Sequence, residues 1–332
     1  MEIRKIQKTG ASTMTVSLPK RWVEQQGLRR GDPLEVEMLR DGSISLSSVL
    51  NERDERRKKT VYVNKDEMGS HLMRKLIAAY LAGYDIIEVR SQERLDFELK
   101  REVKEFSKLV IGPEVIDETS NSLVLHDLSD PAELPQRKCV RRMHLLVNSM
   151  HKDAITSFNE KDQDLAKDVI DRDLDVDRLY LMVVKQYNLI LKDRKISEKI
   201  GVDVFEGMNL MLVARLIERI GDHAEKIART SLLHREKGSR AIVKELQELS
   251  DRAIKILDES VDALFKLDIH EANLVIDEGG QLVEDCEKLK PGGEIKGCAG
   301  MHENTVLDSI LRTAMYSIDI AETAINLTMN SD

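Results

Sequence analysis

The feature that most constrains the fold is a weak internal repeat in the C-terminal part of the chain. "DQDLAKDVID" (162–171) aligns with "DIHEANLVID" (268–277) at an offset of 106 residues. "RIGDHAEKI" (219–227) aligns with "YSIDIAETA" (316–324) at an offset of 97. The apolar residues around all four segments follow a helical period. The chain from about residue 136 onward is therefore expected to hold two copies of one helical unit.

Repeats of about 100 residues with three long helices each are typical of three-helix bundles. We predict one bundle over residues 136–236 and a second over 240–330, divided near "REKGSR" (235–240). The Gly-rich segment "KPGGEIKGCAG" (290–300) is predicted to be the loop before the last helix.

Residues 1–50 predict a small β domain. Pro19 and Gly27 mark the two ends of a short helix, in keeping with the preference for proline at helix starts and glycine at helix ends. Alternation of apolar and polar residues indicates three strands, at 14–18, 33–39 and 43–49. A unit of this size buries little core by itself, so we expect it to associate with a second chain.

A charged run, 51–59, is predicted to be a linker or a solvated helix before a further domain, 60–135. In that domain a strand and a helix alternate twice, and two strands follow around the turn "ETSNS". This order indicates a small α/β domain, to which we assign no role. The expected elements are strands at 60–64 and 85–91, helices at 67–83 and 94–110, and a strand pair within 113–128.

Charge is unevenly distributed along the chain. Residues 1–59 hold 13 Lys and Arg against 9 Asp and Glu, a net charge of +4, whereas the remainder holds 38 against 51, a net charge of −13. A basic head on an acidic body suggests two partners of opposite sign. An ordinary solvated surface remains the alternative for the head, because the excess over residues 1–50 is only +2.

Three scattered cysteines, Cys139, Cys286 and Cys298, form no CxxC pair. Their odd number and their spacing favour a reducing compartment over a disulfide framework or a thiolate zinc site. The N-terminus lacks the apolar run of a signal peptide, and no segment has the roughly 18 consecutive apolar residues of a membrane span. We expect a soluble, cytoplasmic protein without membrane insertion.

The segment "LIERIGDHAEKIA" (216–228) carries Glu218, Asp222 and Glu225 at helical spacings of four and three. Like charges at these spacings destabilise a helix by a few tenths of a kcal/mol per pair. On a helical wheel they fall opposite the apolar stripe, which predicts a face exposed to water. A second acidic segment, 169–183, contains the i, i+4 pair Asp173 and Asp177.

Two interpretations of these acids remain open. A charged helix face is most often simply solvated. Alternatively, carboxylates on neighbouring helices bind a hard cation, which would turn their repulsion into attraction. Mg, Mn, Fe and Zn are not distinguished by the sequence, and the ion is either divalent or ferric. His223 lies at the edge of the apolar stripe and is expected to pack between helices rather than to bind metal.

These two segments, "VIDRDLDVDRLY" and "LIERIGDHAEKIA", resemble the PhoU family of phosphate-uptake regulators. That resemblance implies two tandem three-helix bundles that hold surface metal clusters on E/D-x-x-x-D motifs. Asp173 and Asp177 match one motif and Glu218 and Asp222 match another, with Glu225 beside them. In the second repeat the implied ligands are reduced to Asp277, Asp319 and Glu322.

The segment 13–46, with its Ser17-Leu18-Pro19-Lys20 core and "GLRRGD" turn, resembles the AbrB/SpoVT swapped-hairpin DNA-binding domain. That resemblance implies an obligate homodimer. The order of head, α/β domain and repeats resembles archaeal PhoU-type regulators. The expected fold class is therefore multi-domain: an N-terminal swapped-hairpin β domain, a small α/β domain and all-α tandem bundles. The candidate DNA-binding residues are Arg4, Lys5, Lys8, Lys20, Arg21, Arg29 and Arg30.

The leading hypothesis is a dimeric DNA-binding regulator of phosphate uptake with a metal-binding helical sensor, in contact with a phosphate transporter or a signalling protein. The alternative is an adaptor that does not bind DNA, whose head only dimerises and whose body restrains the transporter's ATPase. Catalysis has no support: the chain has no defensible Ser/His/Asp or Cys/His arrangement, no phosphate-binding loop motif and no Glu-x-x-His pair beside inward-facing acids.

Overall fold

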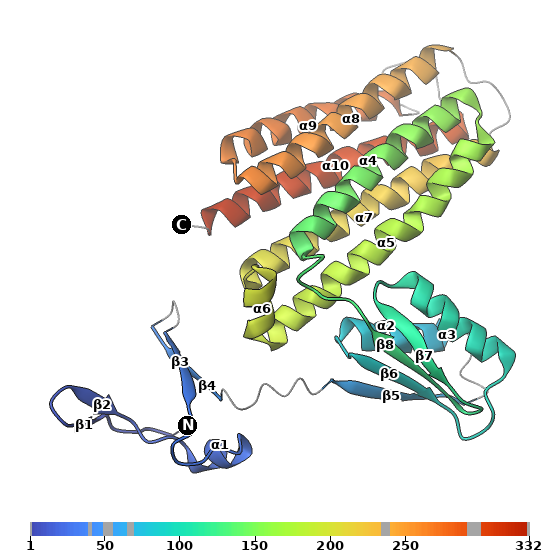
Figure 1. Ribbon diagram of the computed structural model, residues 1–332. Coiled ribbons are helices and arrows are strands. Elements are labelled where there is room, and N and C mark those ends of the chain that lie inside the picture. The colour runs from blue at the N-terminus through green and yellow to red at the C-terminus, as the bar shows by residue number, and fades with distance from the viewer. Residues whose placement is uncertain are drawn as a thin grey trace. The chain divides into compact units, whose positions relative to one another are not determined.

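The computed structural model describes residues 2–38, 42–48, 56–64, 70–233, 240–290 and 300–330, without the side chain of Arg240. The chain forms two compact units, Met1–Arg56 and Arg57–Asp332 (Figure 1). Cys298, most of the predicted bundle boundary at 235–240 and most of the glycine-rich loop at 290–300 lie outside the described residues.

The first unit consists of two separate antiparallel hairpins and one short helix. Its elements are β1 (Gln7–Thr9), β2 (Thr13–Thr15), α1 (Lys20–Gln25), β3 (Leu34–Met38) and β4 (Ile44–Ser48). None of its described apolar residues is buried. More than half of the surface is exposed for each of Ile3, Ile6, Met14, Val16, Val36, Met38 and Ile44. This unit therefore has no hydrophobic core within a single chain.

The second unit begins with the predicted α/β domain. Its elements are β5 (Lys58–Tyr62), α2 (Ser70–Leu81), β6 (Ile86–Arg90), α3 (Phe97–Leu109), β7 (Pro113–Glu118) and β8 (Ser122–Asp127). The sheet order is β5-β6-β8-β7, with β5 parallel to β6 and the other pairs antiparallel. Tyr80 of α2 and Phe106 of α3 pack edge to face in its core. The charged run at 51–59 is not entirely a linker, because residues 58 and 59 belong to β5.

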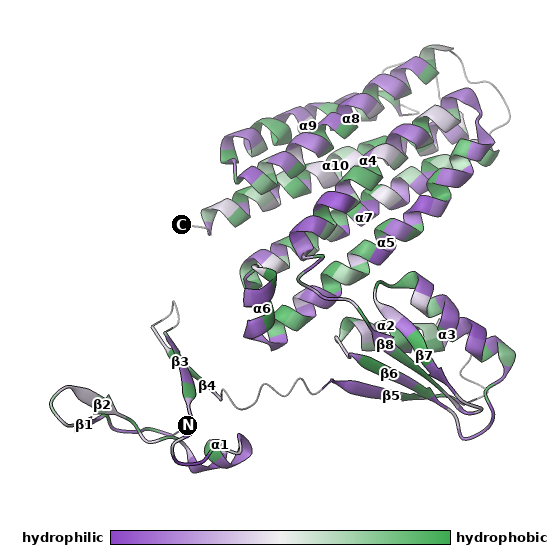
Figure 2. Cartoon of the chain, in the orientation of Figure 1, coloured by the Kyte–Doolittle hydropathy of each residue, from purple (hydrophilic) through white to green (hydrophobic). Residues whose placement is uncertain are grey.

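Seven helices follow (Figure 1). They are α4 (Gln136–Glu160), α5 (Gln163–Lys192), α6 (Arg194–Ile200), α7 (Val204–Leu233), α8 (Arg240–Lys266), α9 (Ile269–Leu289) and α10 (Met301–Met329). One three-helix bundle consists of α4, α5 and α7, and the other consists of α8, α9 and α10. The short helix α6 was not predicted from the sequence. Apolar stripes alternate with polar faces along these helices (Figure 2). The two bundles share one continuous core. Among the described residues, none of the helices combines the length and the apolar character of a membrane span.

The internal repeat is confirmed at the level of single residues. Lys161 and Leu267 are the two non-glycine residues with positive φ in the described chain, and they lie 106 residues apart. Each is followed by an aspartate, Asp162 or Asp268, whose side chain caps the next helix by accepting backbone hydrogen bonds. Both copies therefore turn from their first helix into their second in the same way.

A buried ion pair joins the α/β domain to the first bundle. Lys185 of α5 donates to Asp127 of β8 and to Ser129 Oγ, and only 4% of the Lys185 side chain is exposed. Its ammonium lies 4.8 Å from the centre of the Tyr80 ring, and Asn188 Nδ2 donates to the carbonyl of Leu81 at 2.9 Å. α5 is therefore a structural element of both domains.

Candidate functional site

The first bundle brings α5 and α7 close together at Gly221. A β-carbon at Gly221 would lie 3.4 Å from Asp173 Oδ1 and 3.5 Å from Val176, which is van der Waals contact. The Asp173 carboxylate therefore lies close to the backbone of α7 at this point. Asp173 and Asp177 of α5 are therefore only partly exposed and lie close to the acids of α7, whereas Asp175 is exposed to solvent.

Five acids of the first repeat form one electrostatic group, which we call the carboxylate cluster: Asp173, Asp177, Glu218, Asp222 and Glu225. Burial, followed by the charges of the other four members, raises the pKa of Asp173 to about 7. Burial and the charges of Asp222 and Glu225 also raise the pKa of Asp177. These carboxylates therefore destabilise one another when all are ionised.

Glu218 is the least exposed member of the cluster, with 9% of its surface accessible. Its Oε1 accepts a hydrogen bond from Arg215 at 2.9 Å, while its buried Oε2 has no hydrogen-bond partner. Burial, followed by the charge of Asp222, raises the pKa of Glu218 to about 7. The helical wheel was wrong for this residue, because α7 packs against α4, α5 and α10 and Glu218 is buried, whereas 46% of the Asp222 side chain is exposed.

Arginines of α7 partly neutralise the cluster. Arg215 binds Glu218, Arg219 lies 3.9 Å from both Glu218 Oε2 and Asp222 Oδ2, and Arg229 binds Glu225 at 2.6 Å. Sequence reasoning missed Arg215 and Arg229 as partners of these acids. Their spacing was the available signal, because each lies three or four residues from its acid on the same helix.

The residue types of the cluster fit a hard cation, since they are all oxygen donors and one oxygen is buried without a partner. The side chains are not arranged around a single point. Among the described residues no group of three or more His, Cys, Asp or Glu side chains is placed to hold a metal ion. A cation would therefore require carboxylate rotation and displacement of the arginines.

The corresponding place in the second bundle is closed by apolar packing. At the repeat offsets Gly279 corresponds to Asp173 and Ile318 corresponds to Gly221. A β-carbon at Gly279 would lie 2.6 Å from Ile318 Cγ1, so Ile318 occupies the space that the acid fills in the first repeat. Asp277, Asp319 and Glu322 remain, and all are exposed. Burial and the Glu322 charge raise the pKa of Asp319, but no structural feature joins Asp277 to the other two.

His223 faces away from the cluster. Its Nδ1 lies 3.3 Å from Ser309 Oγ on α10, and its ring centre lies 6.0 Å from that of Tyr316. Burial lowers its pKa to about 4, which keeps the imidazole neutral. This placement agrees with the packing role expected from the sequence.

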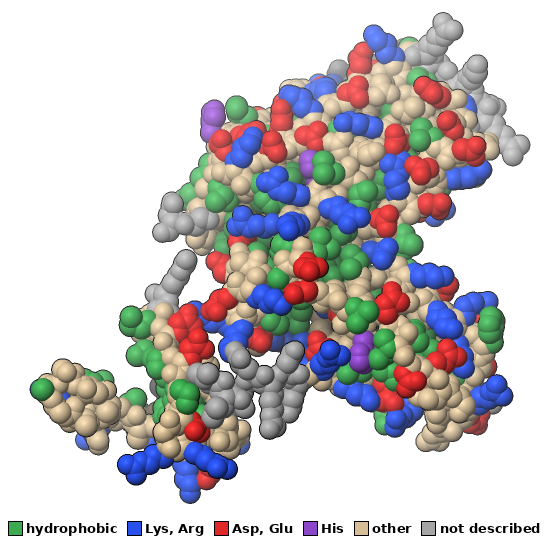
Figure 3. Space-filling model, in the orientation of Figure 1, with side chains coloured by type: hydrophobic (Ala, Val, Ile, Leu, Met, Phe, Trp, Pro, Cys, Tyr) green, Lys and Arg blue, Asp and Glu red, His purple; other side chains and the backbone are tan. Residues whose placement is uncertain are grey.

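All seven candidate DNA-binding residues of the first unit are exposed: Arg4, Lys5, Lys8, Lys20, Arg21, Arg29 and Arg30. Lys20 and Arg21 start α1, and Lys and Arg side chains gather at this end of the unit (Figure 3). Arg4 is partly neutralised, because it binds Glu2 at 2.5 Å and also donates to Ser17. Lys20 lies 3.7 Å from Glu24.

Two protein-family models match the chain. Residues 140–231 match the PhoU domain, and residues 7–53 match the model described as antidote-toxin recognition MazE, bacterial antitoxin. The first match covers most of α4, α5 and α7, and it includes every residue of the carboxylate cluster.

Curated relatives share the helical part. The chain is 29% identical to the phosphate-specific transport system accessory protein PhoU of Escherichia coli over 153 residues, 46% of this chain and 62% of that protein. It is 22% identical over 212 residues to the PhoU homolog of Xylella fastidiosa, which covers 60% of this chain and 80% of that protein. The crystal structure of PhoU from Pseudomonas aeruginosa superimposes with a TM-score of 0.49 at 20% identity, over 60% of this chain and 97% of that one.

Proposed function

Since the chain carries a PhoU domain behind a MazE/AbrB-like N-terminal domain, we propose that it is a phosphate-responsive regulator that binds DNA as a homodimer. The observation that carries this proposal is the joining of a basic, coreless head to a helical body with a half-buried carboxylate cluster. The head would contact promoter DNA, and the body would report phosphate status.

The burial pattern of the head supports dimerisation. Seven large apolar side chains are more than half exposed there, and none of the described apolar residues is buried. Such a surface requires a partner, and exchange of hairpins with a second copy would supply one. A dimer would also present two sets of the basic residues to DNA phosphates.

The helical body is proposed to bind a divalent or ferric cation at the carboxylate cluster. Asp173, Asp177, Glu218, Asp222 and Glu225 would contribute the ligands, and the second repeat would contribute no equivalent site, because Ile318 and Gly279 close it. The bound cation would cancel the carboxylate repulsion and fix α5 against α7. Contact of this body with a phosphate transporter or a signalling protein is part of the proposal.

The DNA-binding role is tested by gel retardation. DNA from upstream of the phosphate-transporter genes should be retarded by the purified protein, and retardation should weaken steeply as salt rises. The double substitution Lys20→Ala/Arg21→Ala should weaken binding uniformly across sequences, because phosphate contacts carry no base information. Unchanged DNA mobility at low salt would refute DNA binding.

The second candidate function is an adaptor whose head only dimerises. Carboxylates beside two of the seven basic residues favour it, since Glu2 binds Arg4 and Glu24 lies beside Lys20. In that case the body alone would bind the ATPase of the phosphate transporter. A pull-down with that ATPase and gel retardation, both performed with wild-type protein and the Lys20→Ala/Arg21→Ala variant, together separate the two. An adaptor captures the ATPase and never retards DNA, whereas the regulator retards DNA and loses that retardation in the variant.

A further inference from the structure

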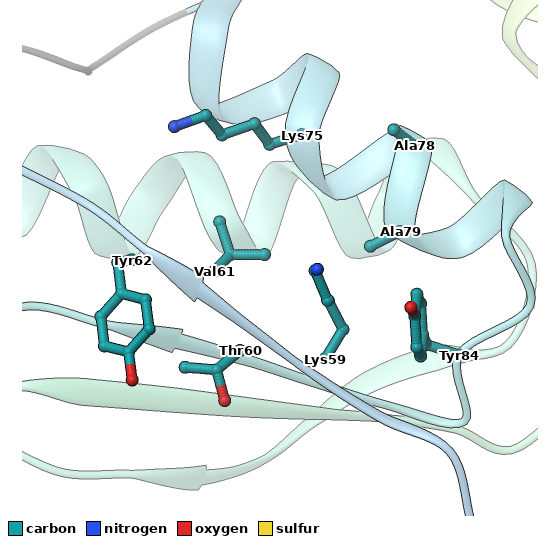
Figure 4. Close-up of a pocket in the computed structure, with 8 residues that line it drawn as sticks. All are labelled: Lys59, Thr60, Val61, Tyr62, Lys75, Ala78, Ala79 and Tyr84. Atoms are coloured by element: carbon teal, nitrogen blue, oxygen red, sulfur yellow. The ribbon is translucent and has the colours of Figure 1, made fainter.

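The α/β domain has an unpaired sheet edge beside a hollow. β5 is the outermost strand of the four-stranded sheet, and within the described residues it pairs only with β6. A hollow of about 380 Å³ lies between this strand and α2, lined by Lys59, Thr60, Val61, Tyr62, Lys75, Ala78, Ala79 and Tyr84. Figure 4 shows Lys59 and Tyr84 pointing toward Ala78 and Ala79 of α2. A strand edge beside a helix forms a groove that fits an extended peptide.

The backbone of β5 offers free hydrogen-bonding groups to such a peptide. The carbonyl of Arg57 accepts from the amide of Ile86, and the amide of Val63 donates to the carbonyl of Arg90, so odd-numbered residues face β6. Because backbone groups alternate along a strand, those of Lys58, Thr60 and Tyr62 point to the open edge. An added strand would therefore bond to the even-numbered residues without disturbing the existing ladder.

Lys59 contributes a positive charge to the groove. Lys58 on the opposite face of the strand binds Glu88 at 2.8 Å, whereas the Lys59 ammonium lies 6.0 Å from the centre of the Tyr84 ring and forms no ion pair within the described residues. An acidic side chain that enters the hollow would supply a counter-charge to Lys59.

We propose that this groove, between β5 and α2, binds an extended acidic peptide segment of a partner protein by strand addition. Main-chain hydrogen bonds to Thr60 and Tyr62 would provide affinity, and an acidic side chain beside Lys59 would provide specificity. Self-pairing of two β5 strands is disfavoured, because adjacent lysines on an edge strand oppose association with an identical strand. The site is independent of DNA and metal binding, so failure of either would leave it standing.

The probe is a fluorescein-labelled hexapeptide, Thr-Val-Glu-Val-Glu-Thr, titrated into the full-length protein and followed by fluorescence anisotropy. We expect saturable binding, loss of binding when lysine replaces both glutamates, and slower hydrogen exchange at the amides of Thr60 and Tyr62. A third peptide carries N-methyl groups on alternate backbone nitrogens and should not bind, because it cannot form the strand ladder.

Two variants and one control locate the site. Lys59→Glu should weaken the acidic peptide at least about tenfold, and Thr60→Pro should abolish binding while sparing the ladder to β6, since the amide of Thr60 faces outward. Arg94→Glu makes the same charge change elsewhere in the domain and should have no effect. Equal binding of all three peptides, or unchanged binding by both variants, would overturn the proposal. The molecular mass of the protein without peptide should also be the same for wild type and Thr60→Pro. A lower mass for Thr60→Pro would overturn the proposal, because it would mean that a second copy of the chain occupies the edge in the wild type.

Discussion

Ile318 packs directly against the backbone of Gly279, and this contact explains why the second bundle has no carboxylate at the place that Asp173 occupies in the first. A β-carbon at Gly279 would lie 2.6 Å from Ile318 Cγ1. The equivalent positions in the first repeat are Gly221 and Asp173, so small and large residues have exchanged helices. One exchange keeps the helices in contact in both bundles but places a carboxylate in one and an isoleucine in the other.

Alanine substitution at the two glycines should have unequal effects. Gly279→Ala should lower the free energy of unfolding by about 1 to 2 kcal/mol. The added methyl group overlaps Ile318, and the cost of this overlap exceeds the gain in helix propensity from glycine to alanine. Gly221→Ala should change it by less than about 1 kcal/mol, because its nearest contacts lie at 3.4 Å. Thermal unfolding of the two variants checks this, and equal destabilisation would contradict the packing described.

Removing one charge from the carboxylate cluster should stabilise the metal-free protein. Asp173→Asn removes repulsion from four neighbouring acids. In chelator at pH 8 the free energy of unfolding should therefore rise by an amount on the order of 1 kcal/mol, and the unfolding midpoint should rise with it. Asp175→Asn is the matched control, since Asp175 is exposed and pairs with Arg178. A lower midpoint for Asp173→Asn than for the control would show that the cluster is not repulsive.

His151 should make the protein acid-sensitive. Its ring is fully buried, neither nitrogen has a hydrogen-bond partner, and burial, with smaller effects from His223 and Lys152, lowers its pKa to about 4. In the unfolded state His151 takes up a proton below about pH 6.5, whereas in the folded state its ring stays neutral down to about pH 4. Above pH 6.5 the ring is neutral in both states, so the protein keeps its full stability. As the pH falls from 6.5 toward 4, the free energy of unfolding should decrease by up to about 1.4 kcal/mol per pH unit.

The substitution His151→Leu isolates this effect from that of the carboxylate cluster, where the raised pKa values of Asp173 and Glu218 act in the opposite direction. The difference in unfolding midpoint between variant and wild type should grow in favour of the variant as the pH falls from 6.5 to 4. Parallel pH profiles for the two proteins would mean that His151 is not buried in its neutral form.

The ion pair between Lys185 and Asp127 should hold the α/β domain on the bundle. Lys185→Met leaves Asp127 buried without its charge partner and should cost about 3 kcal/mol. Adding Asp127→Asn to that variant should recover part of the loss, because the uncompensated charge is gone. Thermal unfolding of both variants tests this, and a double variant less stable than Lys185→Met alone would argue against a coupled pair.

The sequence was sufficient for most elements and for the repeat. The hydrophobic period, Pro19 and Gly27 located helices and strands. The offset of 106 aligned Asp162 with Asp268, which prove to be equivalent helix caps. β1 and α6 were missed, since segments of three and seven residues carry too little periodicity to be recognised.

The sequence was sufficient to identify the residues of the carboxylate cluster, but not to predict how deeply each side chain is buried. Spacing grouped the acids on each helix, yet a helical wheel treats one helix alone and cannot show that packing between helices buries Glu218. Spacing also does not show that Glu218 Oε2 has no hydrogen-bond partner among the described residues, or that Arg215 and Arg229 form hydrogen bonds with Glu218 and Glu225. These facts depend on packing between helices that are distant in sequence.

Metal content is the most direct test of the central claim, that the first-repeat carboxylates bind a cation. Wild-type protein and the double variant Asp173→Asn/Glu218→Gln should each be incubated with manganese, magnesium, iron or zinc, freed of excess ion by gel filtration and measured by elemental analysis. We predict retained metal and a raised unfolding midpoint for the wild type, and neither for the variant. Equal metal content in the two proteins, or none in either, would contradict the claim.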